Sequence, residues 1–66
     1  MRDTILKALE DKYNADISEA EANLKIYLEN PVGVAEHPDI IETIEKELKM
    51  AAEYQDVLDM IPHLKK

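Results

Sequence analysis

The stretch that decides the fold is Asn30-Pro31-Val32-Gly33-Val34-Ala35-Glu36-His37-Pro38. It holds the only glycine of the chain and two of its three prolines. Glycine and proline are the strongest local breaks in a helical pattern, and proline also disfavours helical geometry at the residue before it. The stretch therefore divides the 66-residue chain into two segments, for which we predict helices at about residues 3–30 and 38–60, joined by a loop at 31–37.

The segment before the loop carries a continuous apolar stripe whose members recur at steps of three and four residues, as on one face of an α-helix. The stripe consists of Leu6, Leu9, Tyr13, Ile17, Ala20, Leu24 and Leu28. It repeats after 11 residues, a period close to that of a straight helix, so we expect little supercoil. Either Asp3 or Thr4 is suited to cap the start of this helix.

A break near Asn14 is the alternative for this segment. Ser18-Glu19-Ala20-Glu21 fits the pattern of a helix-starting capping box, and asparagine is a weak helix former. Because the stripe continues in phase across Asn14, we favour one uninterrupted helix.

The second segment begins at Pro38, which suits the first helical position because the missing N–H is not needed there. Its stripe consists of Ile41, Ile44, Leu48, Ala51, Gln55, Leu58 and either Ile61 or Pro62. We predict that Pro62 ends the helix and leaves residues 63–66 as a short tail.

Folding the chain at the loop brings the two stripes together as an antiparallel hairpin. In the register that the stripes suggest, Ala20 faces Leu48 and Ile17 faces Ala51, so that small residues lie opposite large ones. Tyr13 then faces Gln55, whose amide can bond to the tyrosine hydroxyl. The predicted fold class is all-α, with a single helical-hairpin domain over residues 1–66.

Several apolar residues fall outside this seam, and two helices alone seldom bury enough surface to be stable. The set that we assign to an oligomer interface is Ile5, Ile26, Met50, Tyr54 and Val57. A contiguous apolar patch of this kind is rarely left in water, and a two-fold contact lets it cover its own copy. We therefore expect a homodimer, arranged as an antiparallel four-helix bundle.

Charge and composition narrow the classes of partner. The formal net charge is −7 and the isoelectric point is near 4.6, which disfavours binding to nucleic acid or to anionic membranes. No apolar run is long enough to span a bilayer. The chain has no cysteine, which excludes disulfides and thiolate metal sites and is compatible with a reducing cytosol. We expect a soluble, cytoplasmic protein.

Two small groups of polar residues were considered as sites of chemistry. Glu36-His37-Pro38-Asp39 places an imidazole between carboxylates, but at a helix start these residues serve equally as caps. Glu42-x-x-Glu45 resembles half of a di-iron site, yet the Glu-x-x-His motif that such bundles also use is absent. We expect no enzymatic activity, no cofactor and no metal, with a small metal-binding bundle protein as the alternative.

The phrase from Tyr27 to Asp39, followed by Ile40-Ile41-Glu42 and a charged helix, resembles short uncharacterised helical proteins of marine tailed phages, especially those of cyanobacteria. The resemblance covers the loop and the second helix. It implies expression in a bacterial host cytoplasm and carries no assigned activity. With the composition, it favours an interaction or assembly protein, either self-assembling or binding a host or viral protein.

Gly33 yields the first testable prediction. We expect this residue to adopt a positive φ, because a helix reversal of this length commonly needs such a position. Gly33→Ala should then lower the free energy of unfolding by about 1 kcal/mol. Thermal melting followed by circular dichroism measures this, and an unchanged melting temperature would count against a positive φ.

Overall fold

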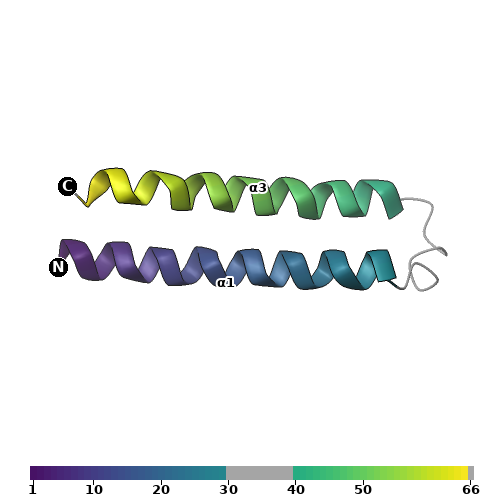
Figure 1. Cartoon of the computed structure of the whole chain (residues 1–66), viewed down its shortest axis with the longest axis horizontal. Coiled ribbons are helices and arrows are strands. Elements are labelled where there is room, and N and C mark those ends of the chain that lie inside the picture. The colour runs from purple at the N-terminus through teal and green to yellow at the C-terminus, as the bar shows by residue number, and fades with distance from the viewer. Residues whose placement is uncertain (30–39, 66) are drawn as a thin grey trace.

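The computed structural model describes residues 1–29 and 40–65, and within these ranges the chain forms two helices and no strand. Helix α1 spans Arg2–Glu29 and helix α3 spans Ile40–Leu64. They lie side by side in opposite directions, so the start of α1 and the end of α3 lie at the same end of a rod measuring 48 × 14 × 13 Å (Figure 1). This confirms the all-α antiparallel hairpin. The predicted loop, with Gly33, lies outside the described residues.

Helix α1 is continuous over 28 residues and passes through Asn14 without interruption. The capping-box pattern at Ser18 therefore does not start a new helix. Before the first turn, the Met1 carbonyl accepts a hydrogen bond from the Ile5 N–H at 3.0 Å. The in-phase apolar stripe prevails over the weak helix propensity at Asn14, because packing against a second helix outweighs single-residue preferences.

Helix α3 continues through Pro62 to Leu64, so the prediction that Pro62 ends the helix was wrong. A proline removes its own N–H donor and crowds the carbonyl four residues earlier. It does not prevent the residues that follow from keeping helical dihedrals, and the Lys65 N–H still donates to the Pro62 carbonyl at 3.3 Å. In the last turn of a helix, one lost hydrogen bond is tolerated.

The seam between the helices repeats every seven residues. Its central positions on α1 are Leu6, Tyr13, Ala20 and Tyr27. Its central positions on α3 are Ile40, Glu47, Tyr54 and Ile61. Half-buried side chains fill the intervening positions, namely Ile17, Leu24, Ile44, Ala51 and Leu58. A seven-residue repeat is the pattern of paired helices that pack along one another, and it replaces the 11-residue repeat that we predicted.

Four predicted seam residues are mainly outside the seam. Leu28 is 66% exposed, Ile41 79%, Leu48 54% and Leu9 37%. Gln55, the predicted partner of Tyr13, is also exposed. On α3 the reason is a rotation by one position: the line through Ile40, Glu47 and Tyr54 faces inward, and the line through Ile41, Leu48 and Gln55 lies on the flank. On α1, Leu9 and Leu28 lie beside the seven-residue line that the seam follows.

Tyr13 and Tyr54 fix the register of the hairpin. Their ring centroids are 5.7 Å apart and the ring planes are inclined by 47°, a favourable tilted geometry. Tyr13 and Tyr54 lie at the same height along the rod. In this register Ala20 lies at the same height as Glu47, and Leu6 lies at the same height as Ile61 near the chain termini. The three most buried side chains are Ala20 at 2% exposure, Ile61 at 3% and Leu6 at 7%.

Ala20 gives a prediction about this close approach of the helices. Ala20→Leu inserts three carbons where there is no room, and should cost about 1–3 kcal/mol of stability. Ala22→Leu is the matched control, because Ala22 is exposed on the same helix. Chemical unfolding at one fixed protein concentration compares the two variants. Equal stabilities would show that Ala20 does not lie in a packed seam.

Candidate interaction site

A polar groove lies between the two helices near the middle of the rod. It encloses about 90 Å³. Its residues from α1 are Asp16, Glu19, Ala20 and Asn23, and those from α3 are Glu47, Met50 and Tyr54. The small Ala20 side chain leaves this space open. Because both helices line the groove, its residues on α1 and its residues on α3 lie on the same side of the hairpin. Together they define one face of the hairpin.

Glu47 is the only charged residue at a central seam position. It is half-buried, and its Oε2 atom is inaccessible to water and has no hydrogen-bond partner among the described residues. A buried polar atom without a partner costs stability. Its place opposite Ala20 is explained by size, since a long side chain needs a small neighbour across the seam.

Lys12 lies at the edge of this region and is held from two sides. Its Nζ donates to Asp16 Oδ2 at 3.2 Å and lies 4.8 Å from the centroid of the Tyr13 ring. The hydrogen bond to Asp16, followed by the charge of that carboxylate, raises the pKa of Lys12 above its ordinary value. Lys12 therefore stays protonated throughout the physiological pH range.

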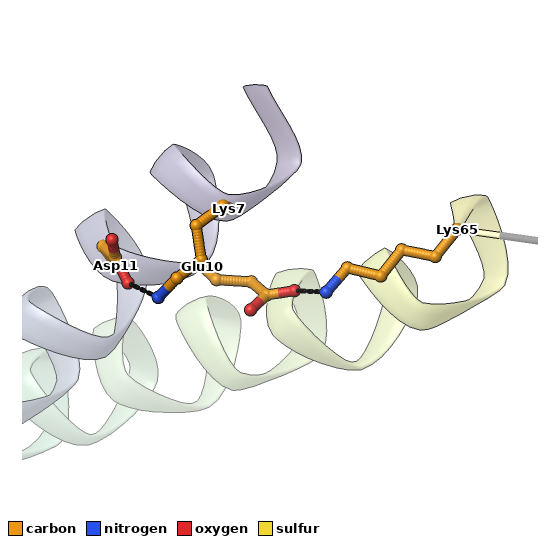
Figure 2. Close-up of polar contacts among 4 residues, drawn as sticks. All are labelled: Lys7, Glu10, Asp11 and Lys65. Atoms are coloured by element: carbon orange, nitrogen blue, oxygen red, sulfur yellow. Dashed lines mark hydrogen bonds and ion pairs between the residues drawn. The ribbon is translucent and has the colours of Figure 1, made fainter. Parts of the chain in front are cut away.

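The opposite side of the hairpin carries an ion pair that joins α1 to the residue after α3. Figure 2 shows Lys65, which directly follows α3, reaching back to Glu10 of α1, beside the Lys7–Asp11 pair within α1 at 2.6 Å. The Lys7 and Asp11 side chains are 68% and 62% exposed, and ion pairs this exposed contribute little to stability. The Glu10–Lys65 pair closes the terminal end of the hairpin.

We name the side that carries the groove the groove face. Seven residues make two helical turns, so residues at that spacing from the groove residues lie on the same side. On α1 the face consists of Ile5, Leu9, Lys12, Asp16, Glu19, Asn23 and Ile26. On α3 the same spacing from Met50 gives Thr43, Val57 and Leu64. Lys46, Glu53 and Met60 lie on the same side, because each precedes Met50, Val57 or Leu64 by four residues, about one helical turn. The most exposed apolar members of the groove face are Met60 at 59%, Ile26 at 58%, Ile5 at 53% and Leu64 at 50%.

A second apolar surface, the loop-end patch, consists of Leu28, Ile41 and Leu48. These residues flank the seam positions Leu24 and Ile44 and so lie on the side opposite the groove. The apolar stripes gave no sign of this patch, because they placed all three residues in the seam. The signal that separates them is the seven-residue spacing of Tyr13, Ala20 and Tyr27, which excludes Leu28.

The five residues predicted for an oligomer interface all lie on the groove side, but they differ in how far they are exposed to solvent. Ile5 and Ile26 are exposed, and Met50 and Val57 are half-buried beside the seam. Tyr54 packs on Tyr13 and belongs to the hairpin itself. The prediction that Tyr54 lies outside the seam was therefore wrong.

The positions considered for metal binding are separate from this region. Glu42 and Glu45 are exposed on α3, and Glu45 lies 3.8 Å from Lys49 in a surface ion pair. Within residues 1–29 and 40–65, no three histidine, cysteine, aspartate or glutamate side chains are placed to hold a metal ion. Glu36, His37 and Asp39 lie outside these ranges.

In comparisons with known proteins, no protein family, no curated protein and no solved structure matches this chain. Within the described part of the chain, neither helix combines the length and apolar character needed to cross a membrane.

Glu47 provides the test of this site. Glu47→Leu removes a buried carboxylate oxygen and adds apolar contact in the seam, and should raise the free energy of unfolding by about 1 kcal/mol. Glu45→Leu, two residues away on the exposed face, should change it by less than about 0.5 kcal/mol. Urea unfolding distinguishes them, and a less stable Glu47→Leu variant would show that the carboxylate has a favourable partner.

Proposed function

We propose that this chain is a non-enzymatic helical interaction or assembly protein that forms a homodimer, with two hairpins joined through their groove faces as a four-helix bundle. One observation carries the proposal. Ile5, Ile26 and Met60 lie on a single face and are each more than half exposed. Apolar side chains gathered on one face of a small protein mark an interaction surface.

The small core of the hairpin also favours association with a second copy. Its three most buried side chains are Leu6, Ala20 and Ile61, and one of them is an alanine. Chains of this length rarely stabilise themselves with so small a core and often add oligomerisation as a support. A second hairpin on the groove face would cover Ile5 and Ile26 and complete the burial of Met50 and Val57.

The acidic charge opposes association only weakly. The net charge of −7 is spread along a rod 48 Å long. At physiological salt, charges on the surface are screened over about 8 Å. Burial of several aliphatic side chains, each worth roughly 1.5–3 kcal/mol, exceeds that repulsion.

An adaptor that binds a further protein is the second candidate. The loop-end patch favours it, because Leu28 at 66% and Ile41 at 79% exposure lie away from the groove face. A dimer formed through the groove face leaves this patch free for a different partner. The resemblance to tailed-phage proteins supports the cytoplasm of an infected bacterium as the setting for both candidates.

The two faces are tested by one pair of substitutions. Ile26→Glu puts a charge into the proposed interface and should weaken dimerisation by at least about tenfold, because the lost burial is worth roughly 1.5–3 kcal/mol. Ile41→Glu makes the same change on the loop-end patch and should leave the dimer intact. Light scattering after size exclusion reads the mass directly. A dimer that survives Ile26→Glu and is lost in Ile41→Glu would contradict the proposal.

A further inference from the structure

We infer that the second copy packs antiparallel on the groove face, α1 against α1, in a register set by Lys12 of each copy and Glu19 of the other. The inference rests on the proposed self-association and specifies its geometry. It follows from one line of residues on α1, together with the charge distribution along the rod.

The line consists of Ile5, Lys12, Glu19 and Ile26, at equal intervals of seven residues. Each interval is about 10 Å along the helix. An antiparallel two-fold axis midway between Lys12 and Glu19 exchanges the two ends of this line. Each Ile5 then meets Ile26 of the second copy, and each Lys12 meets Glu19 of the second copy. The line is therefore complementary to itself in this orientation.

Helix α3 fits the same axis. Because Tyr54 lies level with Tyr13, Met50 lies close to the level of the axis and approaches Met50 of the second copy within about one helical turn. In this register Glu53 of the second copy lies level with Met50, and Lys46 lies about one helical turn from that glutamate along the rod. Methionine adapts well to such central contacts, because its side chain is unbranched and flexible.

A parallel arrangement is unfavourable for electrostatic reasons. It would place Lys12 beside Lys12 and Glu19 beside Glu19. It would also join the two loop ends of the rods, which are rich in carboxylates, with Glu21, Glu29, Glu42 and Glu45 exposed there. The antiparallel arrangement instead places residues 16–51 of each chain, with a formal charge of −6, against residues 1–15 and 52–66 of the other, with a formal charge of −1. This pairing lowers the repulsion between the two rods, and the Lys12–Glu19 contacts then fix the register.

The opposite face lacks this complementarity. The corresponding line there is Lys7, Asn14, Glu21 and Leu28. An antiparallel two-fold axis on that face would set the apolar Leu28 against Lys7 and leave Asn14 against Glu21. The groove face is therefore the one suited to a second copy.

The Lys12 side chain is already oriented for this contact. Its bond to Asp16 at 3.2 Å and its position over Tyr13 hold the ammonium group beside the groove. A side chain that is ordered before binding loses less conformational entropy when the dimer forms. In the dimer, Lys12 would lie between Asp16 of its own chain and Glu19 of the second copy.

Cysteine cross-linking tests the orientation, because the chain has no cysteine of its own. The variants Ile5→Cys and Ile26→Cys are prepared separately, mixed in equal amounts and oxidised in a glutathione buffer. We expect disulfides between the two variants and few within either one, since the two positions are about 30 Å apart along the helix. Disulfides that form mainly within each variant would overturn the antiparallel orientation.

A charge exchange tests the register. Lys12→Glu and Glu19→Lys should each raise the dissociation constant of the dimer by about tenfold, because each change creates two repulsive contacts. The double variant should return to within about threefold of the wild-type value. Lys25→Glu and Glu21→Lys, which make the same charge changes off the groove face, serve as matched controls and should have little effect.

The outcomes distinguish a failure of self-association from a failure of the inferred Lys12–Glu19 register. A wild-type chain that stays monomeric at submillimolar concentration overturns the proposed self-association and this inference with it. A dimer that tolerates both single charge changes, or that the double variant fails to restore, overturns only the inferred register. Weakening by each single change and recovery in the double variant support it.

Discussion

A two-helix hairpin has one internal interface, and that interface can bury only a narrow strip from each helix. Here the strip runs through Leu6, Tyr13 and Ala20 on α1 and through Tyr54 and Ile61 on α3. Every apolar residue beside the strip is left on a flank. The remaining features of the molecule, its exposed isoleucines and its polar groove, follow from this geometric limit. The outer faces of the hairpin therefore carry the apolar residues that can bind a partner.

Within the strip, size governs which residues can meet. Ala20 lets the helices approach closely, and the same small side chain leaves room for Glu47 and for the groove beside it. A carboxylate at a central position costs stability, but a polar residue in a helix seam can also specify register. On the groove face, Lys12 and Glu19 extend the same principle to the contact with a second copy: charge selects the arrangement, and apolar burial supplies most of the free energy.

The sequence was sufficient for the hairpin and for the continuity of α1, because the loop breakers and the in-phase stripes are strong signals. It did not decide the rotation of α3. The line through Ile41, Leu48 and Gln55 and the line through Ile40, Glu47 and Tyr54 each contain one polar residue, so hydrophobicity alone ranks them equally. On α1, repeats of seven and eleven residues share Leu6 and diverge at Tyr27 and Leu28. The mutual packing of Tyr13 and Tyr54 selects one line on each helix.

The most direct measurement of the central claim is sedimentation equilibrium of the unmodified chain, with its helix content recorded at the same concentrations. If the groove face is completed by a second copy, the mass should rise from 7.6 kDa to twice that value, and the helix content should rise with it. A fully helical chain that keeps a mass of 7.6 kDa at the highest concentration would contradict the account. It would show that two helices suffice to hold this fold.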